Sequence, residues 1–188
     1  MILIGELRDA LTTQTAMQAA ESGHLVLTTL HTLDAAEAIG RMIEFFPPEK
    51  HALVRSILSR VLRGVISQRL LPGVGGGRVP AVEVMVNNAR IAELIQDNEI
   101  DGIPAAIEDG DFFKMQTFTR ALIELVMGNQ VERDVAADAA TNRHDFLVAL
   151  DRATKQRAAE ERAAAKEAGR AQEDGLREDG LRLVKQGQ

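Results

Sequence analysis

The opening segment of this sequence, residues 1–9, constrains the fold more than any other feature. Its apolar run I-L-I-G ends directly at an acid, Glu6. This pattern is typical of a buried parallel strand whose carboxyl end presents an acid to a ligand. A second apolar run, residues 24–30, is followed directly by His31. We therefore expect two buried strands, at residues 2–5 and 24–30, each with a chemically useful side chain close to its end.

The first half of the chain alternates between strand and helix patterns. A helix is expected to end at Gly23, and another to begin after the two prolines at 47–48. The helices are expected at 9–22, 34–44 and 49–63, and two more strands at 65–71 and 78–86. This alternation predicts an α/β fold with a mostly parallel sheet. The glycine-rich stretch 72–77 lacks a following Lys and is expected to be a hairpin turn rather than a phosphate cradle.

The second half of the chain reads as almost wholly helical. Helices are expected at 89–97, 115–128 and 132–140, with a turn near 102–104 and a further helix from about His144. Beyond residue 158 the sequence is charged and contains the tandem repeat E-D-G-L-R. The predicted organisation is therefore a sheet-containing domain at 1–87, a helical domain at 88–157 and a charged tail at 158–188.

Composition excludes several classes of function. Aromatic residues make up 3% of the chain and the formal net charge is -6, which disfavours a nucleic-acid partner. There is no cysteine, so disulfides and cysteine-based metal sites are excluded. Neither a signal peptide nor an apolar run of transmembrane length is present. We expect a cytoplasmic protein.

Four segments in order carry a specific resemblance. They are I-L-I-G-E-L-R-D, G-H-L-V-L-T-T-L-H-T-L-D-A-A-E-A-I-G-R-M-I, V-L-R-G-V-I-S-Q-R-L-L-P and G-G-R-V-P-A-V-E-V-M. Together they resemble the later part of the secretion-superfamily hexameric ATPases, and among these the PilT-type pilus retraction ATPases. K-M-Q-T-F and A-T-N-R-H-D-F extend the resemblance to about Leu150. One departure is Ala92, at a position where the family motif A-I-R-N-L-I has Arg.

The resemblance implies a fold and a site. The fold would be part of a RecA-like P-loop NTPase core, followed by a helical C-terminal domain and the charged tail. Residues 2–9 would correspond to the Walker B region, with Gly5 and Glu6 beside the nucleotide and Glu6 as the catalytic glutamate. His31, in the family's His box, would contact the γ-phosphate region, whereas His24 is left open between a structural and a functional role. No residue is assigned as a metal ligand.

The resemblance also implies a cofactor and partners. The complete family member would use ATP and Mg, assemble as a homo-hexamer and act on a pilus platform protein at the inner membrane. Type IV pilus retraction, which drives twitching motility, would be its function. An arginine acting across a subunit boundary is also conceivable, but a local ion pair or a solvated surface is the better interpretation of each candidate. These candidates are Arg41, Arg55, Arg60, Arg63 and Arg69.

One element of a nucleotide site is absent from the 188 residues. No G-x-x-x-x-G-K-S/T loop is present to hold the phosphates. We therefore expect a fragment that begins at Walker B and does not hydrolyse ATP alone. Two alternatives remain. One is a non-catalytic module that docks on a pilus or secretion motor, and the other is a fragment of a pilus-extension or type II secretion ATPase, although such relatives usually carry a tetracysteine zinc motif.

Overall fold

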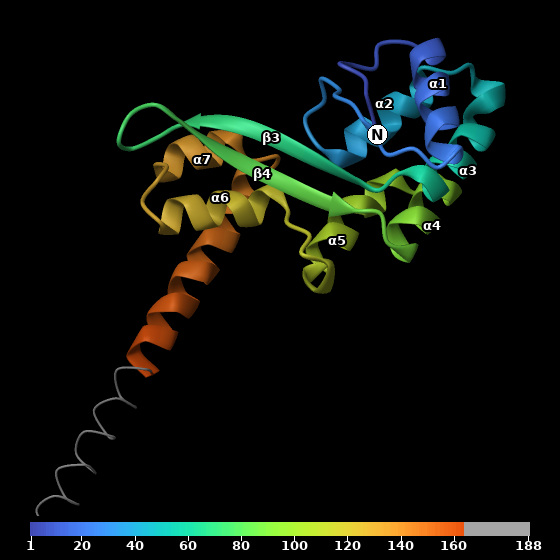
Figure 1. Cartoon of the computed structure of the whole chain (residues 1–188). Helices are drawn as coiled ribbons and strands as arrows, with labels where there is room; N and C mark the ends of the chain where they lie inside the picture. The colour runs from blue at the N-terminus through green and yellow to red at the C-terminus, as the bar shows by residue number, and fades with distance from the viewer. Residues whose placement is uncertain (164–188) are drawn as a thin grey trace, which may run out of the picture. The chain divides into compact units, whose positions relative to one another are not determined.

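The structure, a computed structural model, describes residues 1–163 of the chain (Figure 1). It divides into two compact units, Met1–Thr141 and Asn142–Gln188. In the second unit the described part is a helix at residues 143–163, which confirms the helix expected from about His144. The charged tail predicted at 158–188 lies outside the described residues from position 164 onward. None of the described helices is long and apolar enough to span a bilayer.

The first unit begins with alternating strands and helices, which confirms the α/β class. In chain order the elements are β1 (Ile2–Leu3), α1 (Ala10–Glu21), β2 (Val26–Leu27), α2 (Ala35–Glu44), a 3-10 turn (Pro48–Lys50) and α3 (His51–Val61). β1 and β2 pair in parallel, with Ile2 opposite Val26 and Leu3 opposite Leu27. The strand expected at 24–30 is therefore shorter than predicted, because regular pairing stops where the chain bends at Gly5.

A long antiparallel hairpin follows, formed by β3 (Gly64–Pro72) and β4 (Arg78–Val86). The hairpin turn predicted at 72–77 is confirmed, and Gly76 and Gly77 adopt the positive φ angles that such a turn requires. Parallel pairing is thus confined to β1 and β2 among the described strands, and the longer pair is antiparallel. The hairpin reaches from α3 to the last helices of the unit (Figure 1).

The remaining elements of the first unit are helical, as expected. They are α4 (Ala89–Asp97), a 3-10 turn (Ile100–Gly102), α5 (Ile103–Glu108), a 3-10 turn (Asp111–Phe113), α6 (Phe118–Met127) and α7 (Arg133–Ala139). The turn expected near 102–104 lies slightly earlier, as the 3-10 turn Ile100–Gly102, and α5 begins at Ile103 with Pro104 in its first turn, where proline is tolerated. The helix expected from 115 begins at Phe118, because Gln116 pairs with Val84 of β4 and extends the sheet.

Side-chain caps explain why several helices begin where they do. Asp9, Asp34 and Asn88 precede α1, α2 and α4, and each accepts a hydrogen bond from a backbone N–H of the first turn. Such a cap satisfies a donor that has no partner within the helix. Behind these helices an apolar cluster of buried residues packs together. It includes Ile39, Ile43, Leu58, Met85, Ile91, Leu94, Ile95 and Ile107. This cluster has members on both sides of residue 87, and the domain boundary placed there stays a prediction.

A buried carboxylate connects α2 to the hairpin. Glu83 of β4 is buried, and its Oε1 accepts a hydrogen bond of 2.9 Å from the N–H of Ala35, the first residue of α2. Burial, with the negative charge of Asp34 nearby, raises the pKa of the Glu83 carboxyl above its ordinary value of 4.5. The N-terminal end of a helix carries partial positive charge, which favours the ionised carboxylate. This bond therefore fixes where α2 begins relative to β4.

We predict that Glu83→Ala destabilises the chain by about 1–3 kcal/mol, because the completely buried N–H of Ala35 loses its acceptor. Urea unfolding followed by circular dichroism measures this change. Glu83→Gln is the matched control, since its amide oxygen can still accept the bond, and it should lose less stability. Equal losses in the two variants would contradict this account of the bond.

The raised pKa of Glu83 also predicts a dependence of stability on pH. The folded chain holds the Glu83 proton to higher pH than the unfolded chain does. The protonated group therefore stabilises the fold below about pH 4.5, and this contribution is lost as the pH rises through the folded pKa. The free energy of unfolding of Glu83→Gln, relative to the unsubstituted chain, should therefore increase with pH across this window. A difference that stays constant, or that falls with pH, would show that the Glu83 pKa is not raised.

Candidate functional site

The candidate site lies where β1 ends. Along β1 the backbone hydrogen bonds to the neighbouring segment are regularly spaced. The N–H of Ile2 donates to the carbonyl of Leu25, and the N–H of Ile4 donates to the carbonyl of Leu27. The next bond to the carbonyl of Thr29 comes from Leu7, one residue later than regular pairing requires. The extra residue makes a local bulge at Gly5 and Glu6, and bulges re-aim side chains beside functional sites.

Two interactions hold this bulge in place. The hydroxyl of Thr29 donates a hydrogen bond of 2.5 Å to the carbonyl of Gly5. Two residues further on, Leu7 is buried in the core and returns the chain to the sheet. A Cβ atom on Gly5 would meet no atom within 4 Å, so the space beside this residue is open. Glu6 is thus presented on a fixed backbone with open space next to it.

The structure brings together the two side chains that the sequence singled out. The Nε2 of His31 lies 3.4 Å from the Oε1 of Glu6. Glu6 keeps 21% of its side-chain surface exposed, whereas His31 is 88% exposed. Parallel strands explain the proximity, since their carboxyl ends meet at one edge of a sheet. A half-buried carboxylate beside an open imidazole is an arrangement that can bind and orient a polar ligand or a water molecule.

Arg8 is a third member of this cluster, and the sequence analysis did not predict it. Its Nε donates a hydrogen bond of 2.7 Å to Oε2 of Glu6, and a terminal nitrogen of the same guanidinium lies 2.5 Å from that oxygen. The hydrogen bond from Arg8, aided by its charge and that of His31, lowers the pKa of the Glu6 carboxyl below 4.5. The sequence signal that could have indicated this ion pair is the segment E-L-R, in which Arg8 follows Glu6 by two residues.

The loop that carries His31 is anchored at its far end. The N–H of Leu33 donates to Oε2 of Glu37 at 2.7 Å, and the carbonyl of Leu33 accepts from Arg69 at 3.3 Å. The Arg69 guanidinium also donates to the carbonyl of Ala139 at 2.6 Å and lies 4.1 Å from the ring centre of Phe118. Arg69 is therefore a structural link from the His31 loop to α6 and α7, rather than an exposed side chain free to reach another molecule.

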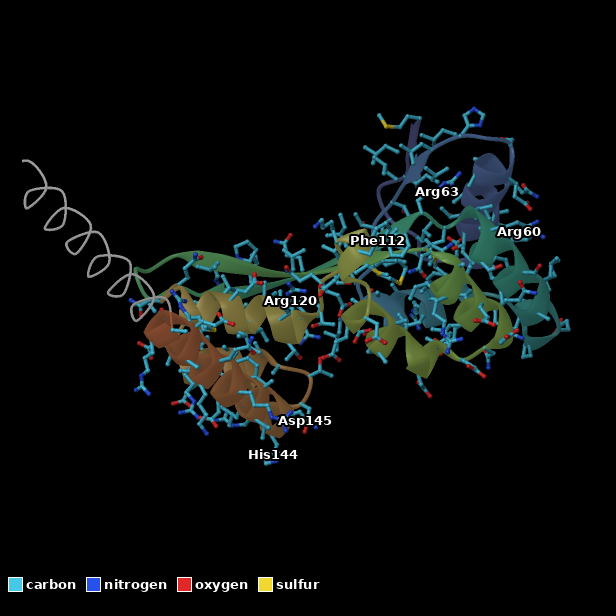
Figure 2. All side chains as sticks on the ribbon, turned by 90° about the horizontal axis from the view of Figure 1, so that it is seen from below. Arg60, Arg63, Phe112, Arg120, His144 and Asp145 are labelled. Carbon is cyan, nitrogen blue, oxygen red and sulfur yellow. The ribbon has the colours of Figure 1, made fainter. Side chains whose placement is uncertain are left out.

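Most other candidates from the sequence have local contacts. Arg41 lies 3.7 Å from Glu44, and Arg55 donates to the carbonyl of Gln96. The Nδ1 of His24 lies 3.0 Å from the hydroxyl of Ser22 and takes no part in the Glu6 cluster. Arg60 and Arg63, labelled in Figure 2, line a cleft beside β2. Within residues 1–163 no group of three His, Asp or Glu side chains is arranged to hold a metal ion.

We predict that Arg8→Ala raises the pKa of Glu6 toward its ordinary value of 4.5, because the carboxylate loses the hydrogen bond and charge that stabilise its ionised form. Titration of the Glu6 side-chain carboxyl carbon by NMR measures the shift. Arg41→Ala, which removes an exposed guanidinium outside the cluster, should leave the Glu6 pKa unchanged. An unchanged Glu6 pKa in Arg8→Ala would show that this ion pair does not persist in solution.

Comparison with known proteins adds a family and a set of relatives. The family model described as type II/IV secretion system protein matches residues 1–188. The type IV pilus retractation ATPase PilT of Pseudomonas aeruginosa is 42% identical over 146 residues, which are 78% of this chain and 42% of that protein. A twitching motility protein of Neisseria gonorrhoeae is 40% identical over 143 residues, which are 76% of this chain and 38% of that protein.

A solved structure has the same fold. The pilus retraction motor PilT, crystallised with bound ADP, superposes with a TM-score of 0.67 and 38% identity, covering 77% of this chain and 40% of that one. The chain thus spans about two fifths of the length of the relatives that it matches. The family match along the whole sequence, the identity to the retraction ATPases and the shared fold agree, and the chain belongs to the type II/IV secretion system ATPase family, with PilT-type retraction ATPases among its relatives.

Proposed function

We propose that this chain forms the Glu6 and His31 part of a nucleotide-hydrolysis site in a motor for type IV pilus retraction. The observation that carries the proposal is the contact between these two side chains at the carboxyl ends of β1 and β2, in a chain whose relatives are pilus retraction ATPases. Open α/β sheets bind ligands at this edge. The absence of cysteine favours retraction over the extension or secretion branch of the family.

The site fits one side of a nucleotide. The space beside Gly5 is open, and Glu6 offers one carboxylate that can accept a hydrogen bond from an attacking water. The exposed His31 imidazole lies on the same side and can contact a phosphate oxygen. ATP would supply the phosphoryl group, and Mg would bind its phosphates, as is usual for this ion. The phosphates themselves need a cradle that residues 1–188 do not contain as a recognisable loop.

The wider assignment follows from the same proposal. The complete motor would be a homo-hexamer at the cytoplasmic face of the inner membrane, where it acts on a pilus platform protein. The second candidate is a non-catalytic module that binds a full-length motor, and the missing phosphate loop favours it. The two candidates differ in whether Glu6 is needed for ATP turnover once a phosphate loop is present.

We predict that the purified chain alone shows no Mg-dependent ATP hydrolysis above a protein-free blank. Phosphoryl transfer depends almost entirely on positioning and charge stabilisation, and the groups that position the phosphates are missing. A coupled phosphate-release assay measures the rate. Robust Mg-dependent turnover by the chain would contradict the prediction and would require a phosphate site of a different kind.

A hybrid protein separates the two candidates. The matched segment of the Pseudomonas aeruginosa retractation ATPase is replaced by the corresponding residues of this chain, and the hybrid is assayed for ATP hydrolysis and for twitching in a strain that lacks the native enzyme. We predict that it is active and that Glu6→Gln lowers its turnover about 100-fold or more. Glu49→Gln, on the exposed 3-10 turn, is the matched control and should keep full activity. An active hybrid that tolerates Glu6→Gln would contradict the proposed role.

A further inference from the structure

Thr29 contacts the backbone on both sides of Glu6. Its hydroxyl donates a hydrogen bond of 2.5 Å to the carbonyl of Gly5, the residue before Glu6. Its own carbonyl accepts a hydrogen bond of 3.0 Å from the N–H of Leu7, the residue after Glu6. A side chain and a backbone group of one residue therefore hold the two peptide groups that flank Glu6.

These two peptide groups determine the direction of the Glu6 side chain. The carbonyl of Gly5 lies in the peptide plane that rotates with φ of Glu6, and the N–H of Leu7 lies in the plane that rotates with ψ. Because peptide groups are planar, φ and ψ are the two soft dihedral angles in the backbone of a residue. Thr29 restrains both of them, and the direction of the Glu6 Cα–Cβ bond follows.

The bulge explains why a side-chain hydrogen bond matters at this place. In regular pairing Glu6 rather than Leu7 would donate to the carbonyl of Thr29, and the extra residue disrupts the backbone pairing locally. The disrupted stretch includes Gly5, and glycine has more backbone freedom than other residue types. The hydroxyl of Thr29 binds the carbonyl of this residue. It thereby restrains the part of the bulge that regular pairing leaves free to move.

Thr29 also belongs to the segment that carries His31. It lies two residues before His31, and its hydroxyl bond joins residues that are 24 positions apart in the sequence. The distance of 3.4 Å between Nε2 of His31 and Oε1 of Glu6 depends on how these two segments are joined. Thr29 is itself exposed and is not part of the buried apolar cluster, so a change of its side chain leaves the core intact.

We propose that Thr29 is a positioning residue for Glu6, whose hydroxyl and carbonyl fix the backbone of the bulge so that the carboxylate is held in one orientation beside His31. The identity of the reaction rests on the proposed function, whereas the restraint itself depends only on the two hydrogen bonds. Thr29 acts through Glu6 and does not touch the reacting atoms.

The first test measures ATP turnover by the hybrid protein. Thr29→Val removes the hydroxyl but keeps a branched side chain, and we expect it to lower kcat about tenfold or more while KM for ATP stays within about twofold, because a misplaced catalytic group slows the reaction without weakening binding. Thr29→Ser keeps the hydroxyl and should restore most of kcat. Thr15→Val is the matched control, since it removes an exposed hydroxyl that donates to the Leu11 carbonyl within α1, and it should keep full activity.

A double variant separates positioning from a general loss of structure. If Thr29 acts through Glu6, then Thr29→Val should not slow the Glu6→Gln hybrid any further. The proposal is overturned if the two effects multiply, if Thr29→Val keeps kcat within about twofold of the unsubstituted hybrid, or if Thr29→Ser is as slow as Thr29→Val.

Hydrogen exchange in the chain alone tests the restraint without ATP turnover. The Leu7 amide should exchange about fivefold faster in Thr29→Val, which corresponds to the loss of one ordinary hydrogen bond. The Ile4 amide, which donates to the Leu27 carbonyl, should keep its rate. An unchanged rate at Leu7, or an equal increase at Ile4, would overturn the proposal. If the hybrid is inactive or tolerates Glu6→Gln, the proposed function fails, and the exchange rates alone then decide whether Thr29 fixes the Glu6 backbone.

Discussion

The hydrogen bond from the buried Glu83 carboxylate to the N-terminus of α2 is the contact on which the arrangement of the site depends. It joins β4 to the residue at which the His31 loop becomes a helix. Arg69, on the neighbouring strand, holds the same loop through the carbonyl of Leu33. Because both anchors belong to the hairpin, the position of His31 relative to Glu6 is set by β3 and β4 as well as by the short pair β1 and β2.

Local sequence patterns predicted most of the elements and placed Glu6 and His31 close to two strand ends. Asp9 and Asp34 cap helices whose starts were expected within one residue, since capping is encoded over three or four positions. The proximity of Glu6 to His31 also followed from local patterns, because two apolar runs separated by a helix form parallel neighbours and their ends coincide. Periodicity therefore placed Glu6 and His31 close to the ends of neighbouring strands, whereas their role in a nucleotide site came from the family resemblance and stays a prediction.

Contacts between distant segments could not be predicted in the same way. Glu83 and Ala35 are 48 residues apart, and nothing in V-E-V distinguishes a buried anchor from an exposed strand residue. The bulge after β1 is equally hidden, because it is visible only when Leu7 rather than Glu6 is found to donate to Thr29. The short extent of β2 has the same cause, since pairing depends on the neighbouring strand and not on the apolar run alone.

The electrostatics of Glu6 limit the chemistry that it can perform. Arg8 lowers the pKa of this carboxyl, so the ionised form is favoured and its basicity is reduced. A strong general base has a pKa near the working pH. The pKa of Glu6 in this arrangement is lowered further below that range. Phosphoryl transfer through a loose transition state asks little of a base and much of positioning. In the proposed site, Glu6 would therefore be better suited to orient a water molecule than to remove its proton early, and movement of Arg8 away from the carboxylate would increase its basicity.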